Sequence, residues 1–286
     1  MRTAPHRILR RFYADDSGRR PFVSALFDDA AEHYDWVCRM MSFGAGQLYR
    51  RLALTRVGLA PGMRLLDVAT GTGLVARSAL HVLGQPGGVV GVDPSRGMLE
   101  KAAETLTSPL VQARAEALPF RAGHFDRVSM GYALRHVAEL EVTFLEFARV
   151  LKPGGRLLIL EISRPRSLIA RSLLQLYLGR VLPLVVRIGT GHRNAELLVK
   201  YYWETIAECV PVEKIVEIVQ ASGFVEVEHR MLGGFLANLC VSKKALICDS
   251  ENSTSRSSAT VAVWITAPEL SCRWNICTQR SWAKKS

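Results

Sequence analysis

Short apolar runs rich in Val, Ile and Leu alternate with segments of helical spacing in the first half of the chain, and two further strand-like runs follow near residue 230. Strands that alternate with helices in this way predict an α/β fold with a doubly wound, mostly parallel, seven-stranded sheet. The predicted strands are Arg64–Ala69, Gly88–Asp93, Leu110–Ala113, Phe125–Gly131, Arg156–Glu161, Phe224–His229 and Leu236–Val241.

Helical segments are predicted before and between these strands. From Ser24 to Met41, apolar residues recur at helical spacing and Ser24 can serve as an N-cap, so a helix precedes the first strand. The stretch from Ser167 to Ala221 is mainly helical and separates the fifth strand from the sixth. We expect this stretch to form a helical cap over the active site.

Composition divides the chain into three parts. Residues 1–22 form a basic N-terminal extension, residues 23–245 contain the predicted sheet and helices, and residues 246–286 form a tail that we expect to be disordered. The tail includes the polar linker Asp249–Thr260 and one strand-like run, Val261–Thr266.

The net charge of the 286-residue chain is +11, which raises the question of a nucleic-acid partner. More than half of that charge lies in residues 1–20 and 245–286, outside the predicted domain. The domain itself is only mildly basic, and it lacks basic runs interleaved with aromatic residues. We therefore expect no nucleic-acid partner.

Cysteine spacing bears on metal binding and on the compartment. The six cysteines include no C-x-x-C pair, and His33 is the one histidine close to any of them, with no second pair of ligands. This pattern predicts a protein without a structural metal in a reducing, cytoplasmic environment.

The segment 167–189 is strongly apolar, although no segment of the chain reaches the roughly 18 uninterrupted apolar residues that suggest a membrane span. Arg171, Arg180 and Arg187 are spaced along it, and Pro183 is expected to break or kink it. Two interpretations stay open. The segment is either a lid that touches a membrane, with its arginines near lipid phosphates, or a cap helix buried on the sheet.

A candidate nucleoside site follows the first two predicted strands. The run from Asp67 to Gly73 reads DVATGTG, and its residues Gly71 and Gly73 permit a tight turn and the close approach of a ligand to the backbone. Asp93, at the end of the second strand, has two carboxylate oxygens that can accept both hydroxyl groups of a ribose. Dinucleotide-dependent oxidoreductases share this glycine spacing, so the glycines alone leave two cofactor classes open.

Three further features favour S-adenosylmethionine over a dinucleotide. The charge of Asp67 suits the ammonium group of a methionyl moiety, and Met98 can pack on adenine. Ala115 and Glu116, after the third strand, can form the edge of an adenine pocket. Together with Thr70 in the glycine loop, these residues make up the predicted cofactor site.

Five segments carry a resemblance to a known family. From about Val23 to Ala245, the chain resembles class I S-adenosylmethionine-dependent methyltransferases, which have a Rossmann-like fold. Within that group it is similar to the UbiE-type C-methyltransferases of ubiquinone and menaquinone synthesis. The segments are FDDAAEHYDWVCRMMSFG (Phe27–Gly44), LLDVATGTG (Leu65–Gly73), AEALPF (Ala115–Phe120), YALRHV (Tyr132–Val137) and RVLKPGGRLLILEISRP (Arg149–Pro165).

The resemblance implies S-adenosyl-L-methionine as the cofactor and a lipophilic, prenylated phenol or quinol as the methyl acceptor. It places Asp67, Gly71 and Gly73 in the cofactor loop, Asp93 on the ribose, and Ala115-Glu116 in the adenine pocket. Three positions differ from the family pattern and bear on the acceptor more than on the cofactor. Leu74 stands where an acidic residue is usual, Arg114 where another polar residue is usual, and Arg135-His136-Val137 where Arg-Asn-Val is usual.

Methylation of an aromatic carbon requires an electron-rich ring, and the loss of a phenolic proton supplies it. His136 is the candidate base, because an imidazole titrates near neutral pH. Arg135 is the candidate cation for the developing phenolate, and Tyr34 can relay a proton or orient the acceptor. Each of the three also has a purely structural interpretation, as a buried histidine, an ion-paired arginine and a packed tyrosine.

Other functions stay open at this point. One is N- or O-methylation of a headgroup amine or of a natural-product phenol. Another is a binding protein that keeps the fold without catalysis. Enzymes that methylate the amino groups of bases usually carry Asn/Asp-Pro-Pro-Tyr/Phe after the fourth strand, whereas this chain has Met-Gly-Tyr-Ala at 130–133.

Overall fold

The computed structural model describes residues 3–85, 87–162, 165, 167–232 and 237–244. The predicted linker, the tail 246–286 with its strand-like run, and Leu236 lie outside the described residues.

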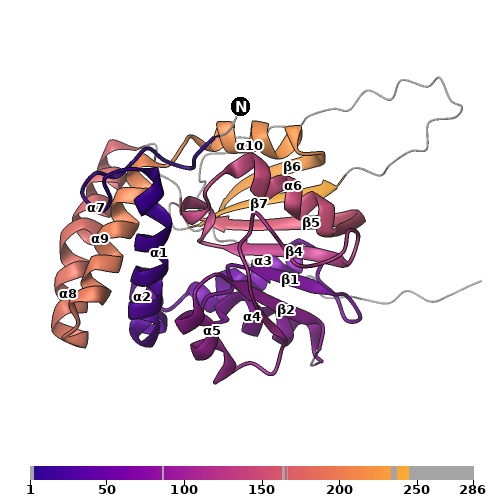
Figure 1. Ribbon diagram of the computed structural model, residues 1–286, viewed down its shortest axis with the longest axis horizontal. Helices are drawn as coiled ribbons and strands as arrows, with labels where there is room; N and C mark the ends of the chain where they lie inside the picture. The colour runs from indigo at the N-terminus through magenta and orange to yellow at the C-terminus, as the bar shows by residue number, and fades with distance from the viewer. Residues whose placement is uncertain (1–2, 86, 163–164, 166, 233–236, 245–286) are drawn as a thin grey trace, which may run out of the picture. The chain divides into compact units, whose positions relative to one another are not determined.

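A seven-stranded sheet is the centre of the fold, and its strand order is β3-β2-β1-β4-β5-β7-β6 (Figure 1). The first five strands in this order are parallel, and β7 runs antiparallel to both β5 and β6. The predicted α/β fold with a mostly parallel sheet is confirmed. The strands are β1 (Leu65–Val68), β2 (Val89–Asp93), β3 (Leu110–Gln112), β4 (Phe125–Gly131), β5 (Leu151–Glu161), β6 (Phe224–Leu232) and β7 (Ala237–Lys244).

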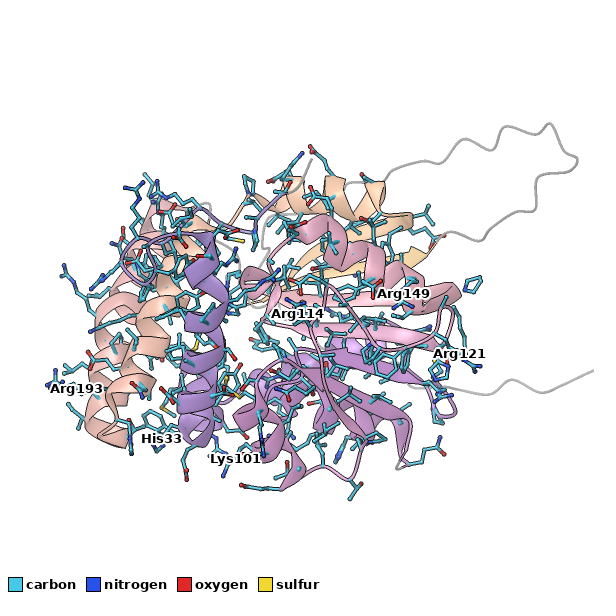
Figure 2. All side chains as sticks on the ribbon, in the orientation of Figure 1. His33, Lys101, Arg114, Arg121, Arg149 and Arg193 are labelled. Carbon is cyan, nitrogen blue, oxygen red and sulfur yellow. The ribbon has the colours of Figure 1, made fainter. Side chains whose placement is uncertain are left out.

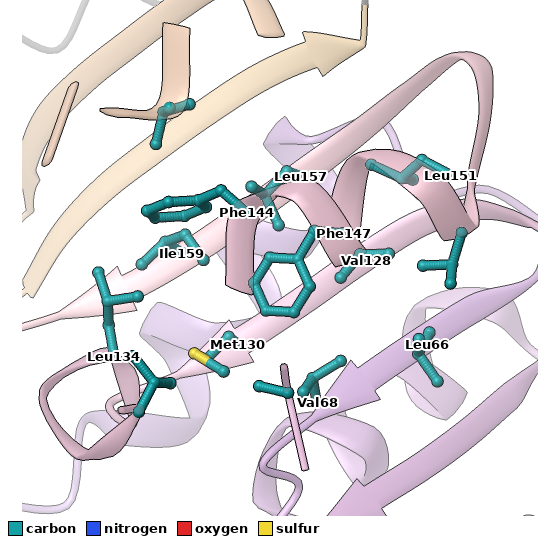
Figure 3. Packing of buried hydrophobic residues seen from close by; sticks show 14 of the residues in the cluster. Leu66, Val68, Val128, Met130, Leu134, Phe144, Phe147, Leu151, Leu157 and Ile159 are labelled. Carbon is teal, nitrogen blue, oxygen red and sulfur yellow. The ribbon is translucent and has the colours of Figure 1, made fainter. Parts of the chain in front are cut away.

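Helices cover both faces of this sheet because its central strands are apolar on both sides. One face packs against α3 (Gly46–Arg56), α4 (Leu74–Leu83) and α5 (Arg96–Ala103). The other face packs against α6 (Leu140–Val150) and α10 (Val212–Ala221). Figure 3 shows the core on this second face, where Phe147 of α6 lies near Val128 and Met130 of β4 and Phe144 lies near Ile159 of β5.

The remaining helices form a cap beyond the carboxyl ends of the parallel strands (Figure 1). The cap has a hydrophobic cluster of its own, which includes Leu26, Val37, Leu174, Val186 and Leu198. Its members are α1 (Asp16–Ala30), a 3-10 turn η1 (Ala31–His33), α2 (Tyr34–Met41), α7 (Leu168–Leu176), a π-helical turn η3 (Tyr177–Val181), α8 (Leu182–Thr190) and α9 (Arg193–Glu208).

The first helix begins earlier than predicted, at Asp16 and not after Ser24. Asp15 is its N-cap, and the Asp15 carboxylate accepts a hydrogen bond from the Gly18 N–H at 3.1 Å. Leu9 and Tyr13 are buried against the cap. The described part of segment 1–22, which the sequence predicts as an extension, therefore packs on the domain.

Pro183 does not break the apolar segment. The π-helical turn at 177–181 leads directly into α8, in which Pro183 is the second residue, and the preceding Leu182 N–H donates to the Tyr177 carbonyl oxygen at the wider π-helical spacing. Leu168–Thr190 is the one helix among the described residues that is long and apolar enough to cross a membrane, and 28% of its most apolar window is buried. That this helix could cross a membrane rests on its length and composition alone.

Candidate active site

The loop after β1 is held together by the Asp67 carboxylate. Thr70 Oγ1 and Ser129 Oγ each donate a hydrogen bond to it, both at 2.7 Å, and burial raises the pKa of Asp67 to about 6. Asp67 and Thr70 do not line the large cavity of the described residues. Both therefore act on the shape of the loop, and the predicted contact of Asp67 with the cofactor ammonium stays a prediction.

The two glycines of this loop have different functions. Gly73 has φ +85°, and a Cβ atom there would lie 2.3 Å from Leu106 Cδ1, so Gly73 permits close packing of the loop on the helix layer. Gly71 has φ +58°, lines the cavity, and donates its N–H to Asp93 Oδ2 at 2.8 Å. Only the second glycine meets the space that a ligand would fill.

Asp93 joins the ends of β1 and β2. Its Oδ2 accepts from Gly71 and its Oδ1 accepts from the Ser95 N–H at 2.9 Å, so each oxygen keeps capacity for one further donor. Burial raises the pKa of Asp93 to about 6, and the charges of Asp67 and Asp28 add to the rise. The carboxylate also lines the cavity, as a ribose ligand must.

The predicted adenine-side residues also lie on the cavity wall. Met98, in the first turn of α5, is almost completely buried, and Ala115 and Glu116 line the same cavity. Glu116 Oε1 accepts a hydrogen bond from the Ala138 N–H at 2.6 Å, which ties this loop to the segment after β4. A thioether, a small side chain and a carboxylate are suited to a flat, polar-edged ring.

The cavity has a volume of about 690 Å³ and extends from these residues to the cap. Its cap side is formed by α1 and the start of α2, which contribute residues that sequence reasoning did not identify. Arg114, labelled in Figure 2, lies on the wall after β3. The additional wall residues include Arg19, Arg20, Val23, Phe27 and Tyr132.

Two carboxylates fasten the cap to the cofactor loops. Asp28 of α1 accepts hydrogen bonds from Ser95 Oγ at 2.5 Å and from the Gly97 N–H at 2.9 Å. Asp35 of α2 accepts a hydrogen bond from Thr72 Oγ1 and forms an ion pair with Arg77 at 2.7 Å. We call these contacts the two carboxylate latches. In the sequence, both residues look like ordinary charges on a helix surface.

His136 lies where the cap meets the segment after β4, and it lines the cavity. Its ring stacks on Tyr201 and Tyr202, with centroid distances of 5.4 and 5.7 Å, and contacts the edge of Phe27. Both ring nitrogens are buried, and neither has a hydrogen-bond partner among the described residues. Burial, helped by the nearby charge of Arg135, lowers the pKa of His136 well below its usual value, so the imidazole is neutral at pH 7.

Arg135 does not line the large cavity. Its guanidinium is buried, lies 3.0 Å from Glu161 Oε1 and stands 5.6 Å from the ring centroid of Tyr202. Glu161 therefore balances its charge. A phenolate in the large cavity would have no direct contact with Arg135, so the predicted role of Arg135 as its cation is not supported by this geometry. A role for Arg135 in positioning His136 and Tyr202 is better supported.

Tyr34, at the start of α2, lies over the glycine loop after β1. A Cβ atom on Gly71 would lie 3.8 Å from Tyr34 Cε1, and Tyr34 also lines the cavity. Burial raises the pKa of Tyr34 well above its usual value, and Cys38 and Tyr202 add to the rise. The phenol is thus protonated at neutral pH and can donate a hydrogen bond.

Arg19, counted in the sequence among the charges of an extension, is buried at the cavity. It donates hydrogen bonds to the carbonyl oxygens of Arg135 and Val137, at 3.2 and 2.9 Å, on either side of His136. The backbone that carries His136 is therefore fixed by α1. Among the described residues, no group of three or more His, Cys, Asp or Glu side chains could hold a metal ion.

Comparison with known proteins agrees with this geometry. A model of the ubiE/COQ5 methyltransferase family matches residues 14–244. The ubiquinone/menaquinone biosynthesis C-methyltransferase UbiE of Shewanella piezotolerans is 34% identical over 223 residues, which are 75% of this chain and 88% of that protein. The protein of the same name from Shewanella woodyi has the same identity and coverage.

Solved structures share the fold at lower identity. An S-adenosylmethionine-dependent methyltransferase from Thermotoga maritima is 20% identical with a TM-score of 0.54, and the match covers 77% of this chain and 99% of that one. A phosphoethanolamine N-methyltransferase from Haemonchus contortus, solved with S-adenosylhomocysteine, is 20% identical with a TM-score of 0.54. That match covers 76% of this chain and 58% of the other, and at this identity both structures bear on the fold alone.

Proposed function

Because the chain belongs to the ubiE/COQ5 methyltransferase family, we propose that it transfers a methyl group from S-adenosylmethionine to a ring carbon of a prenylated quinol. The observation that carries the proposal is a single cavity that joins two kinds of wall. Gly71, Asp93 and Met98 form its cofactor side, and Phe27 and His136 form an aromatic side under the cap. Its volume of about 690 Å³ is in the usual range for small-molecule sites.

The described residues fit the cofactor. Asp93 offers two acceptor oxygens for vicinal hydroxyls, Met98 and Ala115 offer an apolar surface for a purine, and Gly71 lets a ligand approach the backbone. When bound, S-adenosylmethionine supplies an electrophilic methyl group and leaves as a thioether. The contribution of the protein is then to align the acceptor and to exclude water.

His136 is the proposed acceptor of the phenolic proton. A phenol has an ordinary pKa near 10, and the pKa of His136 lies well below 6.5, so complete proton transfer before methylation would cost more than about 4 kcal/mol. His136 therefore accepts a hydrogen bond from the hydroxyl first, and it takes the proton as the ring carbon forms its new bond. The ring carbon then loses its own hydrogen as a proton and the ring oxygen regains one, which restores the aromatic phenol. Tyr34 donates to the acceptor, and Arg135 positions His136 through the Tyr202 ring.

The reaction is tested with S-adenosylmethionine carrying a labelled methyl group and a panel of demethylated quinols, phenols and headgroup amines. The proposal expects a product with the label on a ring carbon, identified by mass spectrometry and NMR. Label on oxygen or nitrogen would overturn C-methylation. Binding of S-adenosylhomocysteine without turnover on any acceptor would favour a binding protein.

We also propose that the enzyme is cytoplasmic and lies against a membrane through α7 and α8. This helical stretch exposes large apolar side chains to solvent, with Leu168, Ile169 and Ile188 each about three-quarters exposed. Arg180 and Arg187 are exposed on the same stretch and would lie at the level of lipid phosphates. A prenylated acceptor could then leave the bilayer close to the cap.

Vesicle flotation tests this contact. The full chain should float with vesicles containing anionic lipid at low salt, and an Ile169→Ser, Ile188→Ser double variant should stay at the bottom of the gradient. Leu145→Ser is the matched control, since Leu145 is exposed on α6, away from the cap. Equal flotation of the two variants would refute the membrane face.

A further inference from the structure

Arg50 of α3 is a buried cation that forms no ion pair with any described residue. It is 7% exposed, and it forms no hydrogen bond with any described residue either. The other two buried arginines of the described residues are compensated. Arg135 pairs with Glu161, and Arg19 donates to two backbone carbonyls. An isolated charge is costly to bury, so Arg50 requires an explanation that packing does not give.

The Arg50 guanidinium borders a small cavity of about 40 Å³ next to the large one. A single water needs about 10–15 Å³, so the small cavity has room for a carboxylate or a phenolic oxygen. Tyr34 and Tyr132 belong to the walls of both cavities. The small cavity therefore borders the space where cofactor and acceptor meet.

The described residues that line the small cavity provide no negative charge. Their ionisable or charged members are Tyr34, Cys38, Tyr49, Arg50, Tyr132, Arg135 and Tyr202. Burial raises the pKa of Tyr132, and the charge of Arg50 opposes that rise. The charge of Arg50 also opposes the rise that burial causes in the pKa of Cys38 and in the pKa of Asp67. The electrostatic field of Arg50 therefore reaches the ends of β1 and β4. The Arg50 guanidinium also stands 5.6 Å from the ring centroid of Tyr132.

Local backbone geometry keeps the guanidinium in place. A Cβ atom on Gly46 would lie 2.9 Å from Arg50 Nη1, so the missing side chain at the start of α3 leaves room for the charged group. The side chain thus points back along its helix to the small cavity and away from solvent.

We propose that Arg50 binds an anionic oxygen in the small cavity. The oxygen has two chemical sources, the carboxylate of the methionyl part of the cofactor or the phenolate of the methyl acceptor. The second source rests on the proposed function, and the first requires only that the protein binds the cofactor. In either case Arg50 is a ligand-binding residue, and its guanidinium gains an anionic partner in direct contact only when the site is filled.

The test compares Arg50→Met with Arg56→Met, which removes an exposed charge from the same helix, and with Arg50→Lys, which keeps the charge. Each protein is titrated with S-adenosylhomocysteine and with 5′-methylthioadenosine, which lacks the amino acid part. Each is also titrated, with S-adenosylhomocysteine bound, with 4-nitrophenol, whose ionised form is coloured. These probes do not require a known acceptor, so they are independent of the proposed reaction.

The carboxylate source predicts that Arg50→Met weakens S-adenosylhomocysteine binding about 10- to 100-fold and leaves 5′-methylthioadenosine binding unchanged. The phenolate source predicts unchanged nucleoside binding and a rise in the pKa of bound 4-nitrophenol. Arg50→Lys should retain part of either effect. If Arg50→Met behaves as Arg56→Met does toward all three probes, the proposal is wrong.

Folding of the variant supplies a second test. Loss of an uncompensated buried charge should leave the melting temperature of the ligand-free protein equal or higher. Arg50→Met protein that unfolds or melts well below the wild type would show that Arg50 is a structural cation, and that result would also overturn the proposal.

Discussion

Replacing Asp93 with Asn tests the assignment of the ribose ligand. The Asp93 carboxylate accepts one backbone N–H on each oxygen and has one acceptor position left on each. An Asn side chain has a single oxygen, and its amide N–H2 group would face the N–H of either Gly71 or Ser95. The variant therefore loses one loop contact and at least one of the two acceptors for the ribose.

The effect on the ligand-free protein follows from the pKa. Folding raises the pKa of Asp93 from 3.8 to about 6, so its protonated form favours the folded state, and this stabilisation is lost as the pH rises through about 6. Above that pH, the buried charge costs about 3 kcal/mol. The Asn variant recovers this cost and loses a charge-assisted hydrogen bond of about 1.5–3 kcal/mol. The two nearly cancel, so its melting temperature at pH 7.5 should lie within about 5 °C of the wild type.

The loss of cofactor affinity in the Asn variant has no such offsetting gain. Loss of one or two charge-assisted hydrogen bonds to ribose costs about 3 kcal/mol, which raises the Kd for S-adenosylhomocysteine about 100-fold. Calorimetry and thermal shift at pH 7.5 measure the two quantities separately. For the wild type, affinity should also fall below about pH 6 as Asp93 is protonated.

Asp126→Asn is the matched control for this substitution. Asp126 lies at the opposite end of β4 and accepts hydrogen bonds from the Arg64 N–H and from Lys152 Nζ. Its variant should be less stable and should bind the cofactor normally. An Asp93→Asn protein that melts normally and binds S-adenosylhomocysteine within threefold of the wild type would refute the ribose assignment.

Three further substitutions test the remaining parts of the site. His136→Phe preserves the aromatic stack on Tyr201 and Tyr202, and it should lower kcat about 100-fold or more while the affinity for S-adenosylhomocysteine stays unchanged. Turnover within threefold of the wild type would show that His136 takes no part in the reaction. Asp35→Asn weakens the ion pair with Arg77 and should speed the dissociation of S-adenosylhomocysteine, measured by stopped flow. Because the ion pair is partly exposed, the free energy of unfolding should fall by only about 1 kcal/mol or less. An unchanged dissociation rate would count against the latch. Gly73→Ala should lower the free energy of unfolding by about 2–4 kcal/mol in urea titrations, because the new Cβ atom would clash with Leu106. Leu106→Ala removes the clashing side chain, so it should destabilise the Gly73→Ala protein less than it destabilises the wild type. Additive losses would exclude this clash as the cause.

The sheet could be predicted because its residues are under one dominant constraint. Parallel strands buried on both faces require continuous apolar runs, and Leu65–Val68 and Val89–Asp93 fall within the predicted ranges. The cofactor loop was accessible for a similar reason, because a tight turn against a ligand selects glycine. The family resemblance drawn from these segments is confirmed by the match over residues 14–244.

The cap and the charges under it could not be predicted in the same way. The early start of α1 depends on Asp15 and on the burial of Arg19, and a charged residue in a polar segment gives no sign that it will be buried. Arg135 and Glu161 are far apart in the sequence, so only the fold pairs them. Arg50 looks like any other arginine on a helix, and the lack of a carboxylate paired with it among the described residues appears only in the folded structure.

The two carboxylate latches connect these observations to the order of events in catalysis. Asp28 binds the segment directly after β2, next to Asp93 at the end of that strand, and Asp35 binds the loop after β1, which contains Gly71. The cap residues that enclose the acceptor are therefore attached to the loops that hold the cofactor. A cofactor that orders these loops also fixes the wall of the acceptor cavity, because the latch hydrogen bonds join the loops to the cap helices that form this wall. We therefore expect ordered binding, with the cofactor first and the acceptor second, and release of S-adenosylhomocysteine only after the latches open.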